Sequence, residues 1–188
     1  MAESLFTVEL RSEVDGNKLT GYGAVFNQYA DLGGYLETLA PSAFDAVLAD
    51  PSSDVRSFFN HDSSMLLGRQ SAGTLRLSVD SHGLAFELDL PETSYANDVR
   101  SLAARGDLTG MSFGFMAGEE QWSTLGARDL RTHVSVAKLI EVSPVSLPAY
   151  PGTTVHLRSL EHIPTHAAID GRIQIIRAKS RAHRKVNN

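Results

Sequence analysis

The stretch Gly110-Met111-Ser112-Phe113-Gly114-Phe115 carries the most information about both fold and chemistry in this chain of 188 residues. Successive side chains of a β-strand point to opposite faces, so the three large apolar residues share one face, and Ser112 and Gly114 share the other. The apolar face predicts a buried strand. The other face sets a hydroxyl beside a residue without a side chain, where another group can approach the backbone closely. An isolated Ser-x-Gly is more often a tight packing point than a nucleophile, so the rest of the chain must decide.

Composition limits the class of protein. Hydrophobic residues make up 42% of the chain and charged residues 21%, as in ordinary soluble globular domains, and the length suits one domain. Cysteine is absent, which excludes disulfides, thiolate nucleophiles and cysteine metal ligands. We see no signal-peptide pattern at the N-terminus, and no apolar run approaches the roughly 20 residues of a membrane span.

Charge is distributed unevenly. Residues 171–188 hold six of the 17 Lys and Arg and no Asp or Glu, so residues 1–170 carry 11 basic and 22 acidic side chains. An acidic body argues against a nucleic-acid-binding domain, and only weak contact of the basic end with nucleic acid remains open. Because disorder concentrates at chain ends, we expect residues 158–188 to be a flexible basic tail.

Alternating apolar residues and turn signals predict about seven short strands and two short helices. One helix should begin at Thr93 or Ser94, run to about Arg105 and end at Gly106, and a shorter one should follow Pro41. The polar stretch 118–127 is typical of a loop or hairpin tip. Strands are expected at 5–10, 18–26, 55–59, 74–79, 84–90, around Ser112, and as one long strand at 130–141. These elements predict a mostly β (α+β) domain with its strands closed into a barrel.

Nucleophilic catalysis is the chemistry that the motifs leave open. The sequence has no metal-binding histidine pattern, P-loop or dinucleotide fingerprint, so we expect neither a metal nor a cofactor. A serine hydroxyl needs a base to take its proton, usually a histidine that a third group orients. His61, in a polar loop after a predicted strand, is the best candidate base, although a loop histidine is often a plain surface residue.

Two residues are candidates for orienting that base. Glu141 precedes an apolar, proline-rich stretch, where a carboxylate usually has a specific partner because an unpaired buried charge is costly. Its alternative role is a structural salt bridge to Arg131 or Lys138. His133 shares a strand face with Arg131 and is the second candidate.

Several blocks occur in a recognisable order along the chain. The three most specific are Asn60-His61-Asp62, Ser112-Phe113-Gly114-Phe115 and Glu141-Val142-Ser143-Pro144-Val145; others lie at 21–27, 37–44, 67–68, 83–84, 106–111 and 148–150. Together, over roughly residues 5–157, they closely resemble the prohead (capsid maturation) proteases of tailed bacteriophages. Ser42 stands where that family commonly has glycine, which should affect a helix start and not the chemistry.

The resemblance implies a serine endopeptidase related in fold to the herpesvirus assemblins, a β-barrel surrounded by helices. It implies Ser112 as the nucleophile, His61 as the general base and Glu141 as the third member. His133 is the alternative third member, because the herpesvirus relatives use a second histidine. Such enzymes act inside the assembling prohead in the host cytoplasm. There they cut the scaffold or the N-terminal scaffolding region of the major capsid protein, and they cut themselves.

The resemblance also divides the chain into a protease domain at 1–157 and the basic tail at 158–188, a candidate self-cleavage region or packaging tether. A homo-oligomer is expected by analogy with the assemblins, and no membrane is involved. Two other functions stay open. One is an inactive capsid scaffold or assembly module with a protease-like fold, and the other is a small β-barrel binding module.

Overall fold

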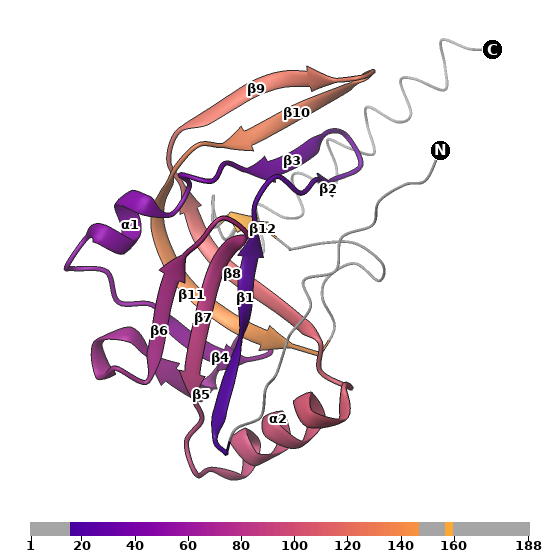
Figure 1. Cartoon of the computed structure of the whole chain (residues 1–188). Helices are drawn as coiled ribbons and strands as arrows, with labels where there is room; N and C mark the ends of the chain where they lie inside the picture. The colour runs from indigo at the N-terminus through magenta and orange to yellow at the C-terminus, as the bar shows by residue number, and fades with distance from the viewer. Residues whose placement is uncertain (1–15, 147–156, 160–188) are drawn as a thin grey trace, which may run out of the picture.

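Twelve strands in three sheets dominate the part of the chain that the computed structural model describes, residues 16–146 and 157–159 (Figure 1). The first sheet has the order β1 (Lys18–Val25), β7 (Gly83–Asp89) and β6 (Leu75–Val79). The second has the order β2 (Ala30–Asp31), β3 (Leu36–Leu39), β10 (Arg128–His133) and β9 (Glu120–Leu125). The third has the order β12 (Leu157–Ser159), β8 (Gly110–Ala117), β11 (Val136–Val145), β4 (Arg56–Phe59) and β5 (Asp62–Arg69).

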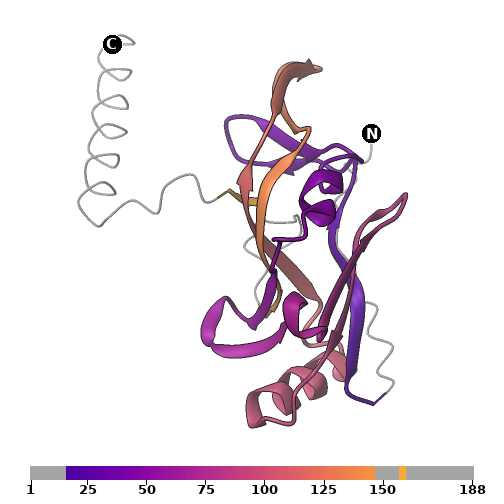
Figure 2. The same cartoon turned by 90° about the vertical axis from the view of Figure 1, so that its left-hand side faces the viewer.

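The first and third sheets lie against each other as two layers, and most of the core is between them (Figure 2). Two glycines mark places where the layers approach most closely. A Cβ atom added to Gly23 of β1 would overlap Val142 of β11, and one added to Gly68 of β5 would overlap Leu88 of β7. Close packing of this kind leaves no room for a larger side chain at either position.

The predicted mostly β class is confirmed, but the expected closed barrel is not found among the described strands. Closure requires every strand to be hydrogen-bonded on both sides, whereas each of the three sheets has two edge strands. The strand expected at 130–141 is in fact β10 and β11, which belong to different sheets. At the corner between them, Val134 and Ser135 both donate their backbone N–H to the Glu119 carbonyl, at 2.9 and 3.2 Å. This bend moves the chain from the second sheet to the third.

The stretch 118–127, expected to be a loop or hairpin tip, is such a tip only in part. Most of it forms β9, which pairs antiparallel with β10, and only the residues around Gly126 (φ 64°) form the tip. β9 is an edge strand with nearly all its side chains exposed, so it lacks the apolar alternation that identifies a half-buried strand. In Figure 1 the β9–β10 hairpin lies at the opposite end of the molecule from α2.

The second predicted helix is confirmed together with its ends. α2 runs over Ser94–Arg105, Thr93 Oγ1 accepts a 3.3 Å hydrogen bond from Ala96 N, and Gly106 ends the helix in a left-handed conformation (φ 77°). The helix after Pro41 is the five-residue α1 (Asp45–Ala49), and a short 3₁₀ turn covers Gln70–Ala72. The expected strand at 5–10 lies outside the described residues, and so does most of the tail expected at 158–188. The first two residues of that tail, 158 and 159, belong instead to β12, which pairs with β8.

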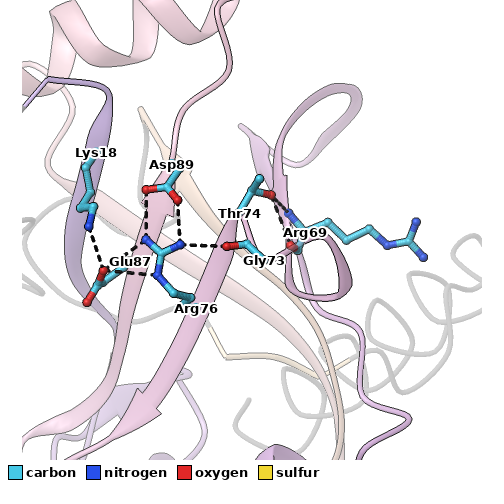
Figure 3. A network of polar contacts seen from close by, with 7 residues as sticks. All are labelled: Lys18, Arg69, Gly73, Thr74, Arg76, Glu87 and Asp89. Atoms are coloured by element: carbon cyan, nitrogen blue, oxygen red, sulfur yellow. Dashed lines mark hydrogen bonds and ion pairs between the residues drawn. The ribbon is translucent and has the colours of Figure 1, made fainter.

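A network of exposed charges joins the three strands of the first sheet (Figure 3). Arg76 of β6 binds Asp89 (Nη1 to Oδ2, 2.7 Å) and Glu87 of β7, and Lys18 of β1 binds Glu87 (3.2 Å). The Arg76 hydrogen bond holds the pKa of Asp89 below its ordinary value. Exposed ion pairs contribute little to stability, so the network mainly favours the observed register.

Candidate active site

His61 lies at the tip of the hairpin between β4 and β5. Phe59 pairs with Asp62, so Asn60 and His61 form a two-residue loop. Both have positive φ, 53° and 63°, which is the pattern of a type I′ turn. Asparagine adopts this conformation readily, but a histidine there costs about 1–2 kcal/mol. Strain of this kind persists only where the surroundings hold the backbone, and it is common at functional sites.

The end of β11 holds this turn in place. Asn60 donates its backbone N–H to the Pro144 carbonyl (3.0 Å), and its side-chain Oδ1 accepts from Ser146 N (2.8 Å) and Ser146 Oγ (3.1 Å). The Pro144 carbonyl faces the turn, so the missing N–H of this proline would also have faced the turn and not β8. Proline therefore fits within β11 without breaking the ladder to β8.

His61 and Glu141 are hydrogen-bonded to each other. The distance from His61 Nδ1 to Glu141 Oε1 is 2.9 Å, and the side chains are 23% and 17% exposed. A carboxylate can only accept hydrogen bonds, so Nδ1 carries the proton of this bond, and in the neutral ring Nε2 has the lone pair. This is the arrangement in which a histidine can accept a proton through Nε2.

Asp62 follows His61 but has a different role. Its Oδ1 accepts from Ser64 N (2.8 Å) and Ser64 Oγ (2.6 Å), and these hydrogen bonds hold the pKa of Asp62 below its ordinary value. The acidic partner of His61 therefore comes from β11 and not from its own loop.

Ser112 lies on β8, directly across from Ser143 of β11, and the next pair on the same face is Gly114 with Glu141. Ser112 is 3% exposed, and its Oγ has no hydrogen-bond partner among the described residues, so it is not bonded to His61. The three candidate catalytic residues thus come from adjacent parts of the third sheet: β8, β11 and the β4–β5 turn.

The opposite face of β8 is core, as its alternation predicts. Met111, Phe113 and Phe115 are 2%, 0% and 0% exposed. The rings of Phe113 and Phe115 stack at 5.2 Å, and Phe44 packs on Phe113 with ring centroids 5.8 Å apart. This packing makes the strand that carries Ser112 a rigid support.

Gly114 provides the close approach that the sequence indicates. A Cβ atom added there would lie 3.0 Å from Glu141 Cγ and 3.3 Å from Glu141 Oε1. The Glu141 carboxylate is thus held between the backbone at Gly114 and the ring of His61. Glycine lets the carboxylate lie against β8, two residues from Ser112.

We expect Gly114→Ala to lower catalytic activity by about 10- to 100-fold, because a shift of the carboxylate by well under 1 Å misplaces the His61 ring. The fold should be kept, since the backbone at Gly114 needs no positive φ. Cleavage rates and a melting curve measure the two effects. Gly34→Ala is the matched control, because a Cβ atom there meets nothing within 4 Å. Equal activity of the two variants would contradict this role of Gly114.

His133 lies in a second polar cluster. Its Nε2 is 2.7 Å from Glu37 Oε1, both side chains are fully buried, and Arg131 Nε donates to Glu37 Oε2 at 3.1 Å. The Arg131 guanidinium also lies over the Tyr35 ring, 5.0 Å from its centroid. The cluster joins β3 to β10 in the second sheet. His133 and Arg131 share a face, as predicted. Both are hydrogen-bonded to Glu37, and Glu120 Oε1 lies 3.5 Å from His133 Nδ1 and from Arg131 Nη1.

The described residues give no sign of two other kinds of site. In 16–146 and 157–159, no three His, Cys, Asp or Glu side chains converge in a way that suits a metal ion. No helix in the same ranges has the length and apolarity needed to cross a bilayer.

Comparison with known proteins assigns the chain to a family. A family model described as caudovirus prohead serine protease matches residues 6–166. The chain belongs to this family. The prohead protease of Enterobacteria phage HK97 is 30% identical over 145 residues, which are 75% of this chain and 60% of that relative, so this chain spans less than two thirds of it. No solved structure is significantly similar.

In this member of the family, sequence reasoning missed two residues of the candidate site. Asn60 anchors the turn, and Ser143 donates to Glu141. Both lie in blocks that carry the family resemblance. A signal for Ser143 was present, because residues two apart in a strand share a face, and Ser143 follows Glu141 at that spacing.

Proposed function

We propose that this protein is a serine endopeptidase of capsid maturation, with Ser112 as nucleophile, His61 as general base and Glu141 as the residue that orients the base. The observation that carries the proposal is the 2.9 Å hydrogen bond between His61 Nδ1 and Glu141 Oε1, beside β8, in a member of a serine protease family. His133 is the less favoured third member, because its ring binds the buried Glu37 in the second sheet.

The proposed reaction uses each of these atoms in turn. His61 Nε2 takes the proton of Ser112 Oγ as that oxygen attacks the peptide carbonyl, and Glu141 stabilises the imidazolium that forms. Nε2 then gives the proton to the leaving amine, which leaves an acyl-enzyme on Ser112. Water, deprotonated by the same histidine, hydrolyses the ester and releases the new carboxyl end.

The burial of Ser112 adds one requirement to this mechanism. A hydroxyl that is 3% exposed cannot meet a peptide bond until the site opens. We propose that engagement of a substrate chain exposes Ser112 and brings its Oγ within hydrogen-bond reach of His61 Nε2. Catalytic hydrogen bonds commonly tighten in this way once the substrate is bound.

The proposed substrates are the scaffold or the N-terminal scaffolding region of the major capsid protein, and the enzyme itself. The proposed place of action is the assembling prohead in the host cytoplasm, and the proposed form is a homo-oligomer. Residues 158–188 are proposed as the self-cleaved end or packaging tether of a protease domain at 1–157. An inactive scaffold with this fold is not favoured, because such a protein would have no need of the paired His61 and Glu141.

The test is co-expression of the chain with the proteins that form the prohead, so that any requirement for assembly is met. Intact masses of the capsid protein are compared for wild type and Ser112→Ala. We expect a defined fragment to be lost with wild type and no cleavage with Ser112→Ala. Equal cleavage in both would contradict Ser112 as nucleophile, and intact capsid protein in both would favour the scaffold function.

A further inference from the structure

We propose that Ser143 is a positioning residue of the site, whose hydroxyl holds the Glu141 carboxylate in the orientation that binds His61. Ser143 Oγ donates to Glu141 Oε2 at 2.7 Å and accepts from the backbone N–H of Phe58 at 3.1 Å. Ser143 is fully buried. The inference rests on the proposed function, and it adds a fourth residue to the three proposed above.

The two oxygens of Glu141 have different partners. Oε1 binds His61 and Oε2 binds Ser143. A carboxylate held through one oxygen can still rotate about its terminal bond, because that torsion is broad. A carboxylate held through both oxygens presents Oε1 to the ring in one orientation only. Ser143 makes no hydrogen bond to Ser112 Oγ, so its proposed action on the base runs through Glu141.

The hydroxyl of Ser143 is itself oriented. Its oxygen accepts from Phe58 N–H, which leaves the hydroxyl proton to point at the carboxylate, where a hydrogen bond to an ionised group is strong. Phe58 lies on β4, three residues before His61. A chain of hydrogen bonds therefore starts in the β4–β5 hairpin, passes through Ser143 and Glu141 of β11, and returns to the same hairpin at His61. These three hydrogen bonds together fix the distance between the hairpin and β11.

A matched pair of variants isolates the hydroxyl. Ser143→Thr keeps the hydroxyl and Ser143→Val replaces it with a methyl group, and the two side chains have nearly the same shape. We expect Ser143→Val and Ser143→Ala to lower kcat by about 10- to 100-fold with little change in KM, and Ser143→Thr to restore most of the activity. The substrate is a peptide spanning the cut site found by co-expression.

Ser57 is the control for loss of a buried hydroxyl as such. It is also fully buried, lies on β4, and its Oγ makes no hydrogen bond in the described residues. Ser57→Ala should therefore leave kcat within about two-fold of wild type. Equal kcat values for Ser143→Thr and Ser143→Val, both near wild type, would overturn the proposal.

A double-mutant cycle separates positioning from a purely structural role. If Ser143 acts through Glu141, removing its hydroxyl should have no further effect on kcat in a Glu141→Ala background. A structural role would give the same fold-loss in both backgrounds, and that result would overturn the inference. The proposed function fails separately, if Ser112→Ala or Glu141→Gln keeps full activity. Inactive Ser112→Ala and Glu141→Gln with a fully active Ser143→Val would exclude only the role of Ser143.

Discussion

Glu141→Gln is expected to lower kcat/KM for peptide cleavage by about 10³- to 10⁴-fold and to leave the fold intact. The amide cannot stabilise an imidazolium, and its NH₂ group can donate to His61 Nδ1. Donation to Nδ1 would move the ring proton to Nε2, the atom that must accept the serine proton. The side chain is 17% exposed and keeps its size, so little stability should be lost. Cleavage kinetics and a thermal melt of the same preparation measure both effects.

His133→Gln is the comparison variant. The ring of His133 binds Glu37 in the second sheet and not the candidate active site. We therefore expect the activity of His133→Gln per folded molecule to stay within about ten-fold of wild type. If His133→Gln instead lost activity and Glu141→Gln kept it, the site would use a pair of histidines. The comparison therefore decides between the two candidates for the third member.

Glu37→Ala is expected to lower the free energy of unfolding by about 3–5 kcal/mol, the usual cost of removing one partner of a buried ion pair. Glu37 is fully buried, and its loss removes the carboxylate to which His133 and Arg131 are hydrogen-bonded, leaving them only the longer 3.5 Å contacts to Glu120. Urea unfolding of the Ser112→Ala protein, with and without Glu37→Ala, gives the difference and avoids self-digestion.

The control for this prediction is the exposed pair of Lys18 and Glu87. Lys18→Ala should cost less than about 1 kcal/mol, because both side chains are in contact with water. A loss below 1 kcal/mol for Glu37→Ala as well would mean that the His133 cluster rehydrates and does not hold β3 to β10. Together the variants should separate two carboxylate–histidine pairs, the part-buried His61–Glu141 pair needed for activity and the fully buried His133–Glu37 pair needed for stability.

Features set by local chemistry were predictable from the sequence. The caps of α2 follow from Thr93 and Gly106, which serve neighbouring backbone groups, and the core face of β8 follows from its alternation. The approach of another group to Gly114 was also predictable. Its identity was not, because the sequence offers several carboxylates and the pairing of β8 with β11 selects Glu141.

Features set by hydrogen bonds between residues far apart in the sequence could not be predicted. The pattern at 130–141 alternates continuously across the corner, so it cannot reveal that the Glu119 carbonyl bends the chain there. β9 has no buried face, so its sequence looks like a loop. The prediction of a closed barrel was wrong for a related reason. Alternation shows which face of a strand is buried, but it does not show whether the first and last strands of a sheet are hydrogen-bonded to each other.

The left-handed backbone at His61 has a practical consequence for anyone engineering a more robust form of this protein. Glycine is the residue whose backbone such a position accepts at least cost, so a search for thermostable variants guided by backbone strain would select His61→Gly. The same change deletes the proposed base. Backbone strain and catalysis thus place opposite demands on position 61, and selection for either one alone would choose a different residue there.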